Sequence, residues 1–307
     1  MPDSPLAVSP YAVLGVTPHA SPDDLRRAFR RRLRETHPDI GGDSTQFVLV
    51  QRAWALVGTP EARAAYDSGS RTFGSADESA GRTWAPEAPR RRENASRPQA
   101  RTHGHPGGWH RERYLDLLRE WVGRGAEIPD PYDPALVRSA PREVRHLLAA
   151  AVAEEKTAVA LAELGIAFTV WNDVRTDAGK IDHIVLGPSG LWGMLSEDWG
   201  AEVSTRRGEI VGASLHPDER PVQELARRCR SFERQARVKF SALVVVVGDG
   251  ASPEGVDALG KVRSARTFLV QRPRLAHLVR SGVPGVGIGG TDLFEVRTRV
   301  QSAARFV

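Results

Sequence analysis

The sequence THPDIGGD, residues 36–43, lies between two segments that both have a helical pattern. Apolar residues recur before it at the spacing of one helix face: Leu25, Ala28, Phe29 and Leu33. A second apolar series follows it: Phe47, Val50, Trp54 and Val57. Pro38 ends the first helix because it disfavours the α conformation of the residue before it, and the glycines that follow allow a turn. The stretch therefore predicts two antiparallel helices joined by a loop, with His37 and Asp39 at its tip.

The first of these helices has a well-marked start and a basic face. Ser21 is a favoured N-cap, Pro22 suits the first helical position, and two acidic residues then suit the positive end of the helix dipole. Arginines occupy the face opposite the apolar one: Arg26, Arg27, Arg30, Arg31 and Arg34. Such a face is often only a solvated surface. Here it runs toward the His-Pro-Asp tip, and this combination favours a surface that binds a partner.

Taken together, residues 9–67 resemble the J-domain, the module with which proteins of the DnaJ family engage DnaK-class ATP-driven chaperones. Residues 11–16 are similar to the family's first helix with its Leu-Gly-Val exit, and residues 25–36 to its second helix. Residues 37–39 are similar to its signature tripeptide. Residues 47–56 are similar to its third helix, and residues 60–67 to its final Arg-x-x-Tyr-Asp segment. The resemblance implies an all-α helical hairpin, and we expect this J-domain to occupy residues 1–67.

The resemblance also implies that the tripeptide and the basic helix face dock on a DnaK-class chaperone and promote ATP hydrolysis there. Carried over by position, the partner-binding residues are His37, Pro38, Asp39, Arg26, Arg30 and Arg31. Phe29 stands where the family usually has tyrosine, so a hydroxyl contact is lost and the ring is kept. The arginines complement an acidic surface and raise the rate of encounter. A module of this kind catalyses nothing itself, since it needs only to bind the reactive conformation of its partner better than the resting one.

Residues 68–110 show no apolar period and are rich in Ser, Gly, Pro and Arg, which predicts a disordered tether. Its main aromatics, Trp84 and Trp109, are isolated. The arginine run at residues 90–92 is typical of solvated charge, with phosphate contact as the alternative. The histidines of this segment lack an acid or cysteine that would complete a site, so we expect no bound metal. We expect no cofactor either.

The whole chain has 307 residues, so more than one domain is expected. Cys229 is its only cysteine, which excludes an intrachain disulfide and the zinc module of some larger DnaJ proteins. The longest apolar run, residues 242–247, is too short to span a bilayer and predicts a buried strand. Residues 1–20 lack the features of a signal peptide, so we expect a cytoplasmic location without a membrane partner. The net charge of +5 permits contact with nucleic acid without demonstrating it.

Residues 111–307 alternate between helical and strand patterns, which predicts an α/β (α+β) domain. A long helix is predicted at residues 141–164, ending at Gly165. Strands are predicted at residues 166–171, 180–186, 190–195, 239–247 and 266–270, with two more near 201–214. Further helices are predicted at residues 219–237, 272–281 and 291–304.

This domain resembles the NERD domain, a nuclease-related module with a restriction-endonuclease-like core. The resemblance rests on Glu154 in the long helix, on residues 172–174, on IDHIVLGPSG at residues 181–190 and on Trp199-Gly200. It implies magnesium-assisted hydrolysis of phosphodiesters. In that chemistry a helix glutamate and two strand carboxylates hold the metal, and a lysine two residues beyond the second carboxylate stabilises charge.

Glu154 and Asp182 match the implied ligands, but Leu195 and Glu197 stand where the second strand carboxylate and the lysine are expected. An alkyl side chain cannot bind a cation, and an anion repels phosphate. Three rescues stay open. Glu197 acts as a ligand, Lys180 supplies the cation because it shares a strand face with Asp182, or a partner subunit completes the site. Otherwise the site is degenerate, with no catalytic residue, and Glu154 is then an acid on the helix surface.

The leading hypothesis is therefore a non-enzymatic co-chaperone. Its J-domain recruits and activates a DnaK-class ATPase, and its C-terminal domain selects where this happens by binding a client, a nucleic acid or another protein. A flexible tether raises the local concentration of chaperone near that target. The alternative is a magnesium-dependent nuclease with an appended chaperone-recruiting domain. A third hypothesis is a protein that binds nucleic acid without cleaving it.

Overall fold

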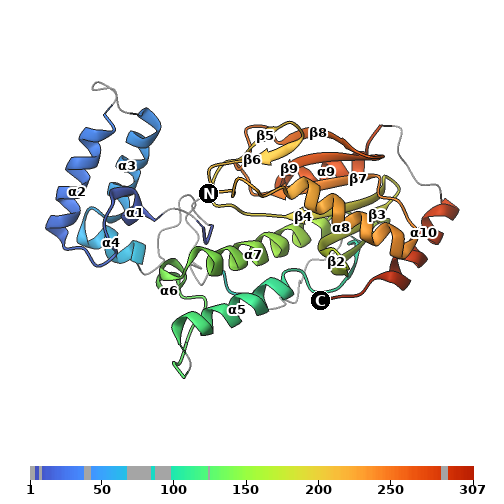
Figure 1. Cartoon of the computed structure of the whole chain (residues 1–307), viewed down its shortest axis with the longest axis horizontal. Helices are drawn as coiled ribbons and strands as arrows, with labels where there is room; N and C mark the ends of the chain where they lie inside the picture. The colour runs from blue at the N-terminus through green and yellow to red at the C-terminus, as the bar shows by residue number, and fades with distance from the viewer. Residues whose placement is uncertain are drawn as a thin grey trace.

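The computed structural model in Figure 1 describes residues 4–6, 9–37, 43–67, 84–86, 98–123, 125–284 and 290–307. It shows a small helical body at the N-terminus and a larger body of helices and strands after it. The predicted order of a helical N-terminal domain followed by a mixed α/β domain is therefore confirmed. In the part of the chain that is described, no helix is both long and apolar enough to cross a membrane.

The helical body consists of α1 (Pro10–Leu14), α2 (Pro22–Glu35), α3 (Ser44–Val57) and α4 (Pro60–Asp67). The predicted start of α2 is confirmed, because Ser21 Oγ accepts a hydrogen bond from the Asp24 amide at 3.2 Å. Buried side chains of α1, α2 and α3 form one core: Tyr11, Leu14, Leu25, Val50, Ala53 and Val57. Beside it Phe29 stacks on Trp54, with ring centroids 4.4 Å apart, and so joins the two long helices.

The C-terminal body is built on a seven-stranded sheet with the order β1-β2-β3-β4-β7-β9-β8. Its strands are β1 (Arg101–His103), β2 (Thr169–Thr176), β3 (Gly179–Gly187), β4 (Gly190–Ser196), β7 (Ala242–Val247), β8 (Val256–Val262) and β9 (Ala265–Gln271). β2, β3 and β4 form an antiparallel meander, whereas β4, β7 and β9 run parallel to one another. A separate hairpin joins β5 (Ser204–Arg206) to β6 (Glu209–Val211).

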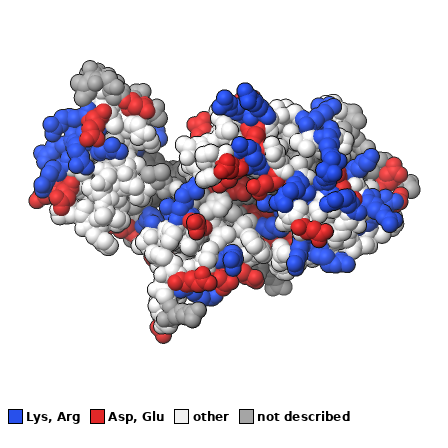
Figure 2. Space-filling view, viewed as in Figure 1, with Lys and Arg blue, Asp and Glu red and all other residues white. Residues whose placement is uncertain are grey.

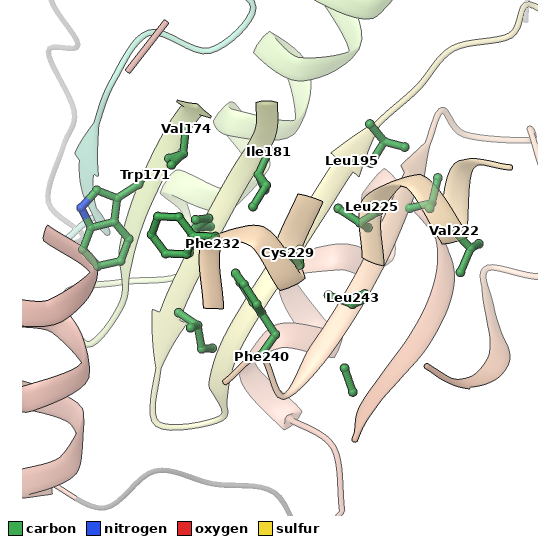
Figure 3. Close-up of a cluster of buried hydrophobic side chains, with 14 of the residues drawn as sticks. Trp171, Val174, Ile181, Leu195, Val222, Leu225, Cys229, Phe232, Phe240 and Leu243 are labelled. Carbon is green, nitrogen blue, oxygen red and sulfur yellow. The ribbon is translucent and has the colours of Figure 1, made fainter. Parts of the chain in front are cut away.

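Helices cover both faces of this sheet. The helices of this body are α5 (Gly108–Val122), α6 (Pro134–Ser139), α7 (Arg142–Ala162), α8 (Pro221–Ala236), α9 (Arg272–Ser281) and α10 (Gly290–Ala303), and the last four of them cover the sheet. Apolar residues of α7 and α9 pack in one buried cluster, and those of α8 and α10 pack in another on the opposite face. Figure 3 shows the second cluster, in which Phe232 and Cys229 of α8 lie over the side chains of the meander. α5 and α6 pack against the outer side of α7.

The predicted disordered tether is wrong at its C-terminal end. β1 pairs in parallel with β2, and α5 already begins at Gly108. Trp84 is buried as well, and its carbonyl accepts a hydrogen bond from Arg111 Nη1 at 2.7 Å. β1 reads Arg-Thr-His, and so short and polar an edge strand has no alternation to reveal it; its place is set by pairing with β2. Most of the remaining tether, residues 68–83 and 87–97, lies outside the described residues.

The predicted elements of the C-terminal domain otherwise have close counterparts, with three differences, the first of which is the short helix α6, which was not predicted. The strand expected at residues 166–171 is β2, which begins only at Thr169 because a turn follows the left-handed Gly165 at φ 95°. β8 was not predicted, since its sequence VDALGKV has a glycine and no clean alternation. It belongs to the sheet because it pairs along β9.

Candidate functional site

α2 presents the predicted partner-binding arginines on an exposed face. Arg26 is 58% exposed and pairs with Asp23 at 3.4 Å. Arg31 is 62% exposed and pairs with Glu35 at 3.9 Å. Exposed pairs within one helix contribute only about 0–1 kcal/mol, so acids of a partner can replace them at little cost. Arg30 is also exposed and forms no ion pair with the residues that the structure describes. Figure 2 shows basic side chains gathered on the outer side of the helical body, over α2.

His37 follows Thr36, the C-cap of α2, and contacts both long helices. Its amide donates to the Arg34 carbonyl at 3.3 Å, which continues the last turn. Its ring meets Phe47 of α3 edge to face, with centroids 5.0 Å apart. The basic face of α2 therefore ends at a positioned imidazole, as predicted. Pro38 and Asp39, the other two residues of the tripeptide, lie outside the described residues.

The Arg-x-x-Tyr-Asp close has a structural role in this body. The Tyr11 hydroxyl donates to Asp67 Oδ1 at 2.8 Å, which ties α1 to the end of α4. Arg63 lies over the Tyr11 ring at 5.5 Å and also donates to the Pro18 carbonyl at 2.7 Å. Burial, followed by the Asp67 carboxylate, raises the pKa of Tyr11 to about 12. These residues hold the short helices together and do not cover the arginine face of α2.

In the C-terminal domain the structure brings Lys180 together with three carboxylates. Lys180 Nζ lies 2.7 Å from both carboxylate oxygens of Glu154, 2.7 Å from Asp173 Oδ1 and 2.9 Å from Asp182 Oδ1. α7 supplies Glu154, β2 supplies Asp173, and β3 supplies the other two residues. The carboxylate side chains are at most 1% exposed, and that of Lys180 is 9% exposed. We call these four residues the lysine–carboxylate cluster.

Backbone amides complete the hydrogen bonding of this cluster. The Gly107 amide donates to Glu154 Oε2 at 3.2 Å, and the Ser196 amide donates to Asp182 Oδ2 at 2.7 Å. The Trp109 amide lies 3.4 Å from Asp173 Oδ2. For a degenerate site we expected Glu154 to lie on the helix surface. This expectation is wrong. The segment from Gly107 into α5 covers this part of α7, so the side chain is fully buried.

The charges of the cluster follow from burial and from the single ammonium. Although burial opposes it, the three carboxylates raise the pKa of Lys180 well above its usual value, so the amine stays protonated. Burial alone would raise the pKa of Asp182, but the charge of Lys180 holds this pKa below its usual value. Burial, followed by the charge of Asp182, raises the pKa of Glu154 to about 7. Burial, followed by the charge of Glu154, raises the pKa of Asp173 to about 7. The ammonium therefore pairs with an ionised Asp182, whereas Glu154 and Asp173 lose their protons at a higher pH than usual.

His110 and His183 lie beside the cluster as neutral imidazoles. His110 Nδ1 hydrogen-bonds Glu154 Oε1, and burial followed by Lys180 lowers the pKa of His110 to about 4. His183 is enclosed between strands, with Nδ1 2.7 Å from Asn172 Oδ1 and Nε2 3.1 Å from a serine hydroxyl. Burial lowers its pKa to about 4. His183 is thus a hydrogen-bonded core residue.

Magnesium, which the resemblance implies, does not fit these residues. The Lys180 ammonium already lies among the carboxylate oxygens at 2.7–2.9 Å, whereas magnesium requires about 2.0–2.1 Å. Leu195, at the position of the expected second strand ligand, packs into the apolar cluster of α8. Within the described ranges, no group of three or more His, Cys, Asp or Glu side chains is arranged to hold a metal ion.

Glu197 stands apart from the cluster, at the wall of a cavity of about 700 Å³. Its side chain is 17% exposed, and its Oε2 has no hydrogen-bond partner, with His146 Nε2 at 4.0 Å. Burial, followed by the charge of Asp182, raises the pKa of Glu197 to about 7. Of the predicted site residues, Glu154, Asp182 and Lys180 are therefore brought into contact, and Glu197 is not.

Sequence reasoning missed two members of this site. Asp173 lies within residues 172–174, where no pattern in the sequence marks it as a site residue, and its left-handed backbone (φ 50°) is a local feature that asparagine and aspartate tolerate best. His110 lay in the segment expected to be disordered. α5 begins at Gly108, so His110 lies in its first turn, where it contacts Glu154.

Comparison with known proteins covers the helical body. The model of the DnaJ domain family matches residues 9–67. DnaJ protein homolog 2 of Allium porrum is 42% identical over 57 residues, which are 19% of this chain and 14% of that protein. Chaperone protein DnaJ of Tropheryma whipplei (strain Twist) is 48% identical over 58 residues, 19% of this chain and 17% of that protein. Chaperone protein DnaJ of Leifsonia xyli is 40% identical over 62 residues, which are 19% of this chain and 17% of that protein.

The match thus covers less than a fifth of each relative's length, and the family model ends before the α/β domain begins. The matched residues 9–67 contain the four helices α1 to α4. The N-terminal part of this chain is therefore a J-domain of the DnaJ family.

Proposed function

We propose that this protein is a J-domain co-chaperone, which binds a DnaK-class chaperone and stimulates its ATP hydrolysis. The observation that carries the proposal is the J-domain match over residues 9–67, with an exposed arginine face on α2 that ends at His37. The arginines attract an acidic surface and speed encounter. Preference for the reactive conformation of the chaperone by roughly 1–3 kcal/mol is sufficient for stimulation.

The way the J-domain meets the rest of the chain supports this proposal. Arg138 of α6 donates to the Asp67 carbonyl at 3.3 Å and lies 4.8 Å from the centre of the Tyr66 ring. The contact uses α4, and in Figure 1 α2 lies on the side of the helical body turned away from the α/β domain. The proposed docking face is therefore open to a partner while α4 is in contact with α6.

We assign the C-terminal domain a targeting role, in which it binds a client protein or a nucleic acid and is not an enzyme. The internal ammonium of Lys180 and the alkyl side chain of Leu195 support this assignment, because neither suits metal-assisted hydrolysis. In this proposal the C-terminal domain is a relative of nuclease-like modules that have a restriction-endonuclease-like core. A cytoplasmic location completes the proposal, and the single buried Cys229 is consistent with it.

The second candidate function is a magnesium-dependent nuclease with an appended chaperone-recruiting domain. One observation favours it: Lys180 lies beside Glu154 and Asp182, so an acid–acid–lysine set is present despite Leu195 and Glu197. Cleavage of plasmid DNA with magnesium, lost in Asp182→Ala, would establish this function. We expect no cleavage by the full chain.

The co-chaperone proposal is tested by single-turnover ATP hydrolysis with a DnaK-class chaperone. The full chain is compared with its His37→Gln variant and with His19→Gln, which alters an exposed histidine of the same domain. We expect stimulation by the full chain and by His19→Gln, and none by His37→Gln. Circular dichroism must show the same helix content for all three. Equal stimulation by His37→Gln, or none by the full chain with its J-domain folded, would refute the proposal.

A further inference from the structure

We infer that the Lys180 ammonium is a built-in cation that takes the place of a metal ion, so that the C-terminal domain holds its carboxylates together without divalent metal. The inference rests on the contacts around Lys180 and is independent of the co-chaperone proposal. It also makes a positive statement: removing the ammonium converts the lysine–carboxylate cluster into a site for a divalent cation.

The geometry around Lys180 is that of an ammonium in an oxygen cage. An ammonium has three N–H donors, and here four oxygens from three carboxylates lie 2.7–2.9 Å away. The two oxygens of Glu154 share one side of the cage, while Asp173 and Asp182 supply the others. These distances are those of charge-assisted hydrogen bonds, and they exceed the metal–oxygen distances of magnesium.

A cation at this position relieves repulsion among the carboxylates. Asn172 pairs with His183 and Val174 pairs with Ile181 on β2 and β3, which places Asp173 directly across from Asp182. Facing carboxylates repel each other, and burial strengthens the repulsion because the surrounding dielectric is low. Glu154 adds a third negative group from α7. The ammonium therefore links the carboxylates of α7, β2 and β3, which would otherwise repel one another.

The cluster also leaves no vacancy that a metal would be needed to fill. Glu154 Oε2, one of the four oxygens around the ammonium, also accepts a hydrogen bond from the Gly107 amide, and the outer oxygen of Asp182 accepts one from the Ser196 amide. Several buried side-chain polar atoms in the described part of the chain lack a partner, and none of them belongs to the four cluster residues. A metal ion would have to displace the ammonium, which is covalently attached and whose side chain is only 9% exposed.

The test measures thermal unfolding of the full chain with EDTA, 10 mM magnesium or 10 mM manganese. For the natural protein we expect the same midpoint in all three conditions. Lys180→Met keeps the length of the side chain and removes its charge. Because it leaves buried carboxylates unpaired, we expect its midpoint in EDTA to fall by roughly 6–12 °C. We expect manganese to restore roughly 5–10 °C of that loss, as a ligand at about a hundred times its Kd would.

Lys239→Met is the matched control, since Lys239 is an exposed lysine of the same domain with no ion pair among the described residues. It should behave as the natural protein. A metal-dependent rise in the natural protein that disappears in Asp182→Asn would overturn the inference. So would a Lys180→Met variant as stable as the natural protein, or one that manganese leaves unchanged. If Lys180→Met fails to fold, the titration of the natural protein decides alone.

Discussion

Glu197 is the acid whose neutralisation should stabilise the C-terminal domain most clearly, and the effect should depend on pH. Burial raises its pKa from 4.5 to about 7, and Oε2 lacks a hydrogen-bond partner. Between these pH values the unfolded chain has already lost the proton and the folded domain keeps it. Stability therefore falls as the pH rises through this window and falls no further above it.

The structure gives the magnitude. A rise in pKa from 4.5 to about 7 corresponds to roughly 3 kcal/mol of lost stability once the group is ionised in both states. Residual contact with solvent reduces this value, since the side chain is 17% exposed. Glu197→Gln removes the charge and keeps the shape. We expect it to raise the free energy of unfolding by about 2–3 kcal/mol at pH 8 and by less than about 1 kcal/mol at pH 5.

Thermal unfolding of the full chain measures this difference, with fluorescence of the buried Trp171 and Trp192 reporting on the C-terminal domain. The midpoint of Glu197→Gln at pH 8 should rise by roughly 4–12 °C. Glu202→Gln, at an exposed position of the same segment, should change it little at either pH. An equal shift at pH 5 and pH 8, or a lower midpoint at pH 8, would show that the Glu197 carboxylate does not carry a buried charge.

Three further predictions concern the other contacts. Tyr11→Phe removes the 2.8 Å hydrogen bond to Asp67 and should cost the J-domain about 1–2 kcal/mol, measured as faster amide hydrogen exchange in α4 with α2 less affected. Arg30→Ala should leave the helix content unchanged and weaken stimulation of a DnaK-class ATPase several-fold at low salt; a variant whose stimulation stays normal there would show that this arginine contributes nothing to encounter. Gly107→Ala should lower the midpoint of the C-terminal domain by roughly 2–8 °C, because Gly107 has φ 74° and a Cβ there would lie 2.7 Å from the Ala151 carbonyl; an unchanged midpoint would mean that this loop shifts freely.

The helices of the J-domain were predictable because their signals are local. The cap at Ser21, the proline after it and the apolar stripe through Leu25 all act within one or two turns of α2. The end of the helix before His37 follows from Pro38 in the same way. Packing of these helices then needs only short connections, so pattern and structure agree.

The ends of the sheet were not predictable in this way. β1 has only the residues Arg-Thr-His, and it is a strand because its backbone pairs with the free edge of β2. β8 contains Gly260 within a bulged register and is defined by its pairing with β9. In both strands the stabilising hydrogen bonds come from residues distant in sequence, and no local pattern encodes them.

For the candidate site, the sequence by itself determined the residue types and one shared face. Alternation along β3 placed Lys180 beside Asp182, and the His-Pro-Asp tripeptide with its arginine helix marked the J-domain. Only the tertiary structure decided that Glu154 is buried, that Asp173 joins it, and that the ammonium lies among all three carboxylates. The physical reason is that periodicity fixes directions within one element, whereas burial and charge pairing depend on which elements pack together.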